Sequence, residues 1–172
     1  MTLNKLNHVF LAALCVVSTA IFTGCGRYAI SVNENTVYEP APLFGEYSIA
    51  DAALKTCVKH TIAEKRLTKA EQLKQLICPA GEVTSLEGLE IFTNLEHLGL
   101  AENRVTHIAL LSQLTKLSRV NLRDNRVQNF RPLHVLQQLS QLDARGNSNA
   151  DCSTLIPLTS SVKDIQLPSE CE

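Results

Sequence analysis

Two consecutive stretches decide the fold of this chain: LEHLGLAENRVTHIALLSQLTK at residues 95–116 and LSRVNLRDNRVQNFRPLHVLQQ at residues 117–138. Aligned without a gap, both have apolar residues at the same six positions and asparagine at a seventh. The spacing extends back to Leu73 and forward to Leu139, which gives four copies of 22 residues. Of the 24 apolar framework positions in these copies, 23 are apolar and only Asn149 is not. An amphipathic helix does not reset every 22 residues, so the spacing indicates a repeat.

Each copy predicts a short strand followed by a turn. Leu98 and Leu100 are two residues apart, so in a strand both face inward, while His97, Gly99 and Ala101 face outward. Stacked copies of such a strand form a parallel sheet. A partial fifth copy, shifted by one residue, contains Val162, Ile165 and Leu167 and ends the array.

The recurring asparagines are Asn103, Asn125 and Asn147, each placed where the chain turns away from the strand. An asparagine amide both donates and accepts hydrogen bonds, so it can satisfy backbone groups that would otherwise be buried without partners. The sequence therefore predicts a structural asparagine ladder along one edge of the stack.

The full pattern, L-x-x-L-x-L-x-x-N-x-[IV]-x-x-[IF]-x-x-L, resembles the short 22-residue class of leucine-rich repeats, found in bacterial internalins and in a eukaryotic phosphatase-regulating subunit. The pair Pro132-Leu133 matches a common feature of that class. Over residues 73–167, the resemblance implies an α/β fold: a short right-handed solenoid with a parallel sheet on its concave face and a helical N-terminal cap. Four full repeats, one partial repeat and a C-terminal cap then occupy residues 73–172. The resemblance is specific for fold and not for function.

The N-terminus has the pattern of a targeting signal. Lys5 precedes an apolar run over residues 9–22, which as a helix would span about 21 Å, short of the roughly 30 Å hydrocarbon thickness of a bilayer. Residues 1–24 are therefore predicted to be a signal peptide. The sequence Phe22-Thr23-Gly24-Cys25 resembles the lipobox of bacterial lipoproteins, which implies that Cys25 is lipidated. An uncleaved anchor and an ordinary signal peptide are the alternatives.

These assignments also predict where the protein lies and what the two segments after the signal peptide do. Gly26, in place of Asp, follows the lipidated cysteine, and by the same resemblance this places the protein in the cell envelope, at the outer membrane facing the periplasm. Residues 25–46 lack a helical or alternating pattern and predict a flexible tether. Residues 47–72 carry an apolar stripe at helical spacing and predict the cap, with Ser48 and Asp51 at capping-box spacing.

Four cysteines remain beyond Cys25, in a compartment that permits disulfides. Three connectivities are possible. The repeat puts Cys57 and Cys78 at one end of the stack and Cys152 and Cys171 at the other, so it favours these two local pairs. The alternative is that some of the four are simply small buried apolar residues.

The outward strand positions predict where a partner binds. The candidate residues on this face are His97, Arg119, Asn121, Arg123, Gln141, Asp143 and Arg145. Two interpretations are open for the arginines. Either Asp124 and Asp143 neutralise them on a solvated surface, or Arg119, Arg123 and Arg145 receive an acidic partner.

Composition and motifs argue against other function classes. A formal net charge of −1 does not provide the basic face that nucleic acid requires. No G-x-S-x-G, H-E-x-x-H or phosphate-binding glycine loop occurs, and the histidines are scattered, so we expect no enzyme activity, metal or cofactor. The sequence predicts a monomeric, lipid-anchored module that binds a protein partner. The alternatives are a passive structural lipoprotein and a binder of an anionic glycan or cell-wall component.

Overall fold

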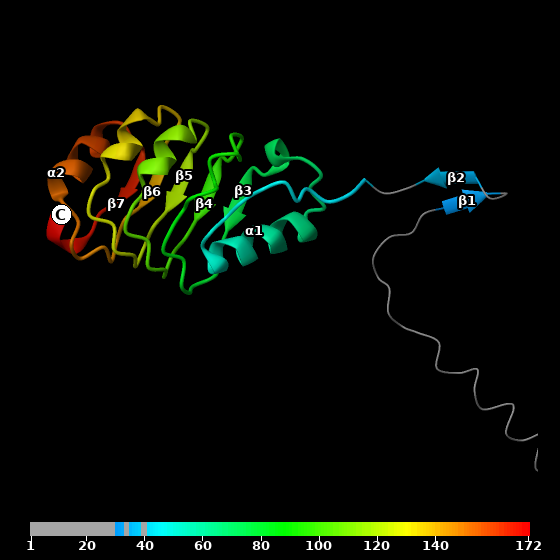
Figure 1. Cartoon of the computed structure of the whole chain (residues 1–172). Helices are drawn as coiled ribbons and strands as arrows, with labels where there is room; N and C mark the ends of the chain where they lie inside the picture. Colours follow the sequence, from blue (N-terminus) through cyan, green and yellow to red (C-terminus); the bar gives the residue numbers. More distant parts are fainter. Residues whose placement is uncertain (1–29, 33–34, 39–40) are drawn as a thin grey trace, which may run out of the picture. The chain divides into compact units, whose positions relative to one another are not determined.

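The computed structural model describes residues 30–32, 35–38 and 41–172 (Figure 1). The predicted signal peptide and Cys25 lie outside these residues. The chain divides into a unit that ends at Ala41 and a unit formed by Pro42–Glu172. Within the described residues, no helix has the length and apolar character needed to cross a bilayer.

The first unit contains an antiparallel pair of strands, β1 (Ile30–Val32) and β2 (Asn35–Tyr38). The pairing brings Ser31 opposite Thr36. These strands, and the inclusion of residues 42–46 in the compact unit, differ from the tether predicted for residues 25–46. The β-branched and aromatic residues of this segment favour strands, but strands of three and four residues are too short to show a clear alternating pattern in the sequence.

The second unit is built on a five-stranded parallel sheet in the order β3 (Gln75–Ile77), β4 (His97–Gly99), β5 (Arg119–Asn121), β6 (Gln141–Asp143) and β7 (Asp164–Gln166). Each strand is the spatial neighbour of the next strand in the sequence. The pairing sets Gln75, His97, Arg119, Gln141 and Asp164 in one row. The predicted α/β leucine-rich-repeat solenoid is confirmed, including the one-residue shift of the last strand.

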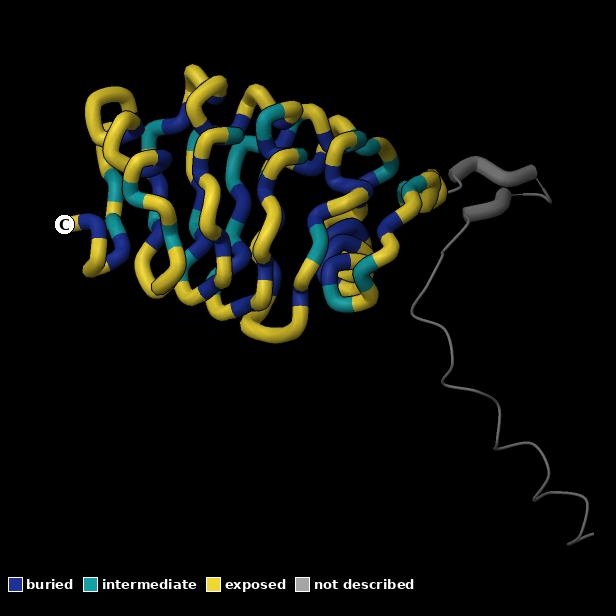
Figure 2. Tube along the Cα trace, turned by 60° about the vertical axis from the view of Figure 1, so that its left-hand side comes forward, coloured by how far each residue is buried: buried dark blue, intermediate teal, exposed yellow. Residues whose placement is uncertain are grey.

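The core lies between this sheet and the outer side of the solenoid. The central residue of each of the first four strands is buried, and so are the other leucines of the repeat: Leu73, Leu86, Leu89, Leu95, Leu100, Leu111, Leu117, Leu122, Leu133, Leu139 and Leu155. The outer side carries short helical turns: η2 (Ala109–Gln113), η3 (Arg131–Val135), α2 (Cys152–Leu155) and η4 (Ile156–Ser160). Figure 2 shows buried residues recurring along each coil of the stack.

Asn149, the one polar framework residue, marks the place where the fourth repeat departs from the others. It is exposed, whereas valines occupy the equivalent buried positions of the earlier repeats. Instead, Asp151 caps the short helix α2 by accepting a hydrogen bond from N of Ser153 at 3.0 Å. The buried hydroxyl of Thr154 accepts a hydrogen bond from N of Phe130 at 3.1 Å.

The N-terminal cap consists of α1 (Ala52–Glu64) and the turn η1 (Ala70–Gln72). Leu54 and Val58 of α1 are fully buried, and the helix contacts β3 at the first edge of the sheet (Figure 1). The capping residue is Asp51, not the Ser48 expected from the capping-box spacing. Asp51 has extended backbone angles and its Oδ1 accepts a hydrogen bond from N of Leu54 at 2.9 Å, so the helix begins three residues later than a cap at Ser48 would place it.

The segment that precedes α1, residues 42–50, packs on the first repeat and is called the arm. N of Phe44 donates to the carbonyl of Leu67 at 2.8 Å. The rings of Phe44 and Tyr47 pack on the buried ring of Phe92, with centroids 6.2 Å and 6.3 Å away. These contacts give residues 42–46 a fixed place that the predicted tether does not have.

A disulfide closes each end of the solenoid. Cys57 of α1 bonds to Cys78, with 5.4 Å between the Cα atoms. Cys152 of α2 bonds to Cys171 of the last turn, η5 (Ser169–Cys171), with 5.3 Å between the Cα atoms. These are the two local pairs that the repeat favoured.

Candidate binding face

The outward face of the sheet is hollowed into a groove of about 480 Å³. Every strand of the sheet contributes to it, through its first and third residues. The first-residue row is Gln75, His97, Arg119, Gln141 and Asp164, and the third-residue row is Ile77, Gly99, Asn121, Asp143 and Gln166. Leu98, Val120, Leu142 and Arg145 complete the lining.

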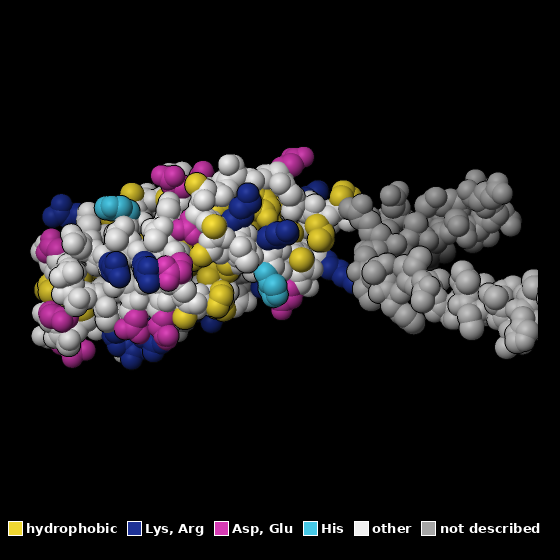
Figure 3. All heavy atoms as spheres, turned by 60° about the horizontal axis from the view of Figure 1, so that its bottom comes forward, with side chains coloured by type: hydrophobic (Ala, Val, Ile, Leu, Met, Phe, Trp, Pro, Cys, Tyr) yellow, Lys and Arg dark blue, Asp and Glu magenta, His cyan; other side chains and the backbone are white. Residues whose placement is uncertain are grey.

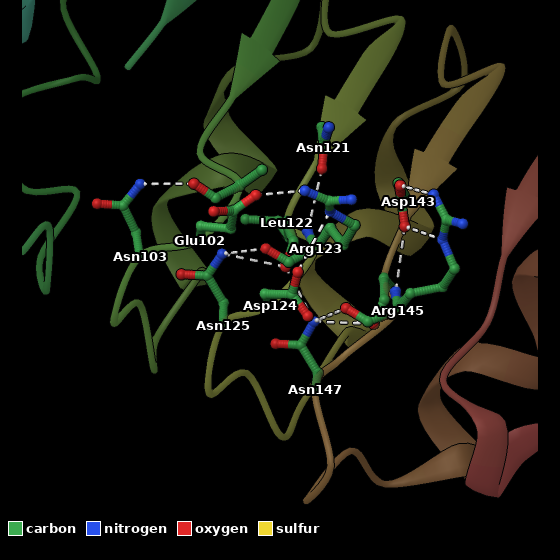
Figure 4. A network of polar contacts seen from close by, with 12 residues as sticks. Glu102, Asn103, Asn121, Leu122, Arg123, Asp124, Asn125, Asp143, Arg145 and Asn147 are labelled. Carbon is green, nitrogen blue, oxygen red and sulfur yellow. Dashed lines mark hydrogen bonds and ion pairs between the residues drawn. The ribbon is translucent and has the colours of Figure 1, made fainter. Parts of the chain in front are cut away.

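Six of the seven predicted binding residues line this groove, and Arg123 does not. Arg123 lies two residues beyond Asn121, whose Oδ1 accepts a hydrogen bond from N of Arg123 at 3.0 Å. Its guanidinium instead bonds to Glu102 of the preceding repeat, and its Nε lies 3.3 Å from Oδ2 of Asp124 in an ion pair without a hydrogen bond (Figure 4). Arg123 lies beyond the end of β5, so its side chain contacts the turn of the preceding repeat and not the groove.

Arg145 lines the groove but is held by an internal ion pair. Its Nε donates to Oδ1 of Asp143 at 3.0 Å and its Nη2 donates to Oδ2 at 2.6 Å, a two-pronged contact (Figure 4). Burial raises the pKa of Asp143, but the hydrogen bonds and charge of Arg145 outweigh it and lower that pKa overall. The same contact raises the pKa of Arg145. Both groups therefore stay charged and mutually engaged.

Arg119 lies at the centre of the groove and, unlike Arg145, bonds to a histidine and not to a carboxylate. Its Nε donates to Nε2 of His97 on the adjacent strand at 2.9 Å. Among the described residues, no carboxylate lies within ion-pair distance of its guanidinium. The side chain is exposed, so its remaining N–H groups are accessible to a ligand.

The asparagine ladder fixes the turns that follow these strands (Figure 4). In its middle, Oδ1 of Asn125 accepts a hydrogen bond from N of Val105 at 2.9 Å, and Nδ2 donates to the carbonyl of Leu100 at 2.7 Å. Oδ1 of Asn103 and Oδ1 of Asn147 accept the equivalent bonds from N of Val83 and N of Val127. Nδ2 of Asn147 donates to the carbonyl of Leu122, as the pattern of Asn125 requires, whereas Nδ2 of Asn103 donates to the carbonyls of Ala101 and Pro79. All three are buried. The ladder holds successive strand ends in register and so keeps the groove continuous.

The charges of the groove cancel. Its lining contains two arginines, Arg119 and Arg145, and two aspartates, Asp143 and Asp164. On the face that Figure 3 shows, acidic and basic side chains are interspersed rather than gathered by sign. Carboxylates within the chain neutralise Arg123 and Arg145. For these two arginines this agrees with the interpretation of a solvated surface on which acidic residues balance the basic ones. Arg119 alone of these three remains available.

Five lining residues of the two rows were not among the predicted binding residues: Gln75, Ile77, Gly99, Asp164 and Gln166. The first three lie in the same repeat columns as the predicted residues, so their position was readable from the sequence. The last two lie on either side of Ile165 in the shifted fifth copy, beyond the columns of the four full copies. The 22-residue repeat was the signal for the first three residues, and the apolar Ile165 and Leu167 were the signal for the last two.

The groove does not offer a recognisable metal centre. Within residues 30–32, 35–38 and 41–172, no group of three or more histidine, cysteine, aspartate or glutamate side chains is placed to hold an ion. The groove is lined by amide side chains, two guanidinium groups, two carboxylates and the imidazole of His97, with Ile77 as its exposed large apolar side chain.

Comparison with known proteins supports the fold. No protein-family model and no curated protein matches the sequence. Among solved structures, an internalin from Listeria monocytogenes matches with a TM-score of 0.60 and 28% identity, over 70% of this chain and 37% of that one. Internalin C2 from the same organism matches with a TM-score of 0.61 and 23% identity, over 74% of this chain and 62% of that one. The chain thus spans less than two thirds of either protein.

Proposed function

We propose that this chain is a lipid-anchored module of a bacterial cell envelope that binds a protein partner through the groove of its sheet. The observation that carries the proposal is the groove itself, to which all five strands contribute side chains. Solenoids of stacked repeats form extended concave surfaces of this kind and use them for binding. The likeness to internalins supports the fold on which this reasoning rests.

The anchor is proposed from residues 1–25, which lie outside the described structure. The lipobox-like sequence that ends at Cys25 supports it. Several acyl chains on one residue would give stable attachment, since each buried CH₂ contributes about 0.8 kcal/mol. Metabolic labelling with a tagged fatty acid tests this. We expect the label and the membrane association to be lost in Cys25→Ser, and retention of both would rule out this anchor.

Crosslinking in cells tests the binding face. A photoreactive residue at Asn121, in the centre of the groove, should capture a specific partner, whereas one at the exposed Gln128, outside the groove, should not. We expect Arg119→Glu to abolish the capture and Arg126→Glu, which changes an exposed arginine outside the groove, to leave it unchanged. Absence of any capture would instead favour the passive structural role.

The balanced charge of the groove does not favour an anionic glycan as ligand. A polyanion binds best to a continuous basic surface, because each added cation contributes to attraction. Here Arg145 is engaged by Asp143, and Asp164 adds a negative charge at the far strand.

A further inference from the structure

The groove is not uniform along the stack, and its asymmetry points to one kind of partner. Within residues 41–172, Ile77 on β3 is the most exposed large apolar side chain, at 63% exposed. Its neighbour in the row is Gly99, where an added Cβ would lie 3.2 Å from Cγ2 of Ile77. The missing side chain at Gly99 leaves one flank of Ile77 open. Together Ile77 and Gly99 form a small apolar shelf at the first end of the groove.

The cation available for binding lies next to this shelf. Arg119 is on β5, the strand after Gly99, and is two positions earlier along the strand register. With strands about 4.8 Å apart and about 3.3 Å per residue, the two Cα atoms are separated by about 8 Å. The hydrogen bond from Nε of Arg119 to His97 orients the guanidinium and leaves its two Nη groups for a ligand. A planar guanidinium presented in this way favours a carboxylate.

The far end of the groove carries the opposite charge. Asp164 on β7 accepts hydrogen bonds only from amides, from Nε2 of Gln141 and Nε2 of Gln166, both at 3.3 Å. It lies in the same row as Arg119 and two strands away, about 10 Å at the backbone. The order along the groove is therefore apolar, cationic, neutral and anionic, which gives a bound segment a direction.

From this order, and resting on the proposed function, we propose that the groove binds a protein segment that carries an apolar side chain and, near it along the segment, a carboxylate. The apolar side chain packs on the shelf of Ile77 and Gly99, and the carboxylate binds Arg119. A basic group farther along the segment faces Asp164. A protein segment is the occupant because it presents apolar, acidic and basic groups together, which matches a groove of zero net charge.

Selection from a displayed library of random linear peptides, against the full chain purified in detergent, tests this inference. We expect wild type to enrich peptides that combine an acidic and a large apolar residue. Arg119→Gln should remove the preference for acidic residues and weaken a selected peptide by about 10-fold to 100-fold, as for a hydrogen bond to a charged group. Ile77→Ser should remove the apolar preference and keep the acidic one.

Matched variants control for effects on folding. Arg126→Gln and Ile156→Ser change exposed residues of the same types outside the groove and should keep both preferences. The inference is overturned if wild type enriches neither residue class, or if the preferences survive Arg119→Gln and Ile77→Ser. Such a result leaves the proposed function standing if the crosslinker at Asn121 still captures a partner. If that capture also fails, the proposed function fails with it.

Discussion

At the scale of single residues, a few polar side chains hold the coils together through bonds to backbone groups. Asn125 lies at the middle of its ladder and bonds to the backbone of both its own repeat and the preceding one. Asp51 does the same at the N-terminal cap. One oxygen accepts from N of Leu54 in α1, and the other accepts from N and Oγ1 of Thr84, both at 2.8 Å, in the first repeat.

Replacing Asn125 by alanine removes the partners of a buried backbone N–H and of buried carbonyls. We expect the free energy of unfolding to fall by about 1–3 kcal/mol, measured by urea denaturation. Asn149→Ala is the matched control. Asn149 is exposed outside the ladder, so its replacement should change stability by less than about 0.5 kcal/mol. Equal effects of the two variants would mean that the ladder is not what stabilises the turns.

Asp51 makes stability depend on pH. Burial raises the pKa of its carboxyl, but the hydrogen bonds from Leu54, Thr84 and Ser85 outweigh burial and lower that pKa below its ordinary value. A carboxyl whose pKa is lowered by folding stabilises the folded state at pH values above its ordinary pKa. This contribution is lost as the pH falls through the folded-state pKa.

We therefore expect Asp51→Asn to be less stable than wild type at neutral pH, with the difference shrinking as the pH falls. Urea denaturation over a pH series measures this difference. Glu46→Gln, which changes an exposed carboxyl of the nearby arm, should give a curve parallel to that of wild type. A constant gap between Asp51→Asn and wild type at every pH would show that ionisation of Asp51 contributes nothing.

At the scale of elements, the cap depends on a close approach between the arm and the first repeat. Gly88 has a φ of +96°, and an added Cβ would lie 2.2 Å from the carbonyl oxygen of Ser48. Both the backbone angle and the space therefore require glycine at this position. Gly81 has no such steric requirement, because the nearest atoms to an added Cβ there are 3.9 Å away.

Gly88→Ala should lower the free energy of unfolding by about 1–3 kcal/mol or more, since it adds backbone strain and displaces the arm. Gly81→Ala should leave stability unchanged or slightly raised, because it reduces the freedom of the unfolded chain. Thermal unfolding of both variants measures the contrast. Proteolysis within residues 42–50 should increase only in Gly88→Ala, and unchanged protection there would contradict the role of Gly88 in docking the arm.

At the scale of the whole compact unit, each repeat contacts only its neighbours, and so the two ends stabilise different parts of the stack. Loss of either disulfide, by Cys57→Ser with Cys78→Ser or by Cys152→Ser with Cys171→Ser, should cost about 2–5 kcal/mol. Hydrogen exchange should then accelerate locally. We expect faster exchange in α1 and β3 for the first pair, and in β6 and β7 for the second. Uniform acceleration over all strands in both variants would instead indicate one global cooperative unit.

The sequence by itself determined the solenoid, its strand register, the asparagine ladder and most of the groove. The 22-residue period determines which residues of each coil face the core and which face solvent. Stacking of the coils then places equivalent residues side by side. Even the shifted fifth strand, with Ile165 paired to Leu142, follows from this one-dimensional pattern.

Only the tertiary structure decided which partner each polar or aromatic side chain takes. Arg123 bonds to Glu102 beside the groove, Arg145 is held by Asp143, and Arg119 remains available in the centre. The docking of Phe44 on Phe92 was equally absent from the repeat pattern. Such contacts depend on the reach and direction of individual side chains across elements, and the three-dimensional packing of the elements sets these, not the spacing along the chain.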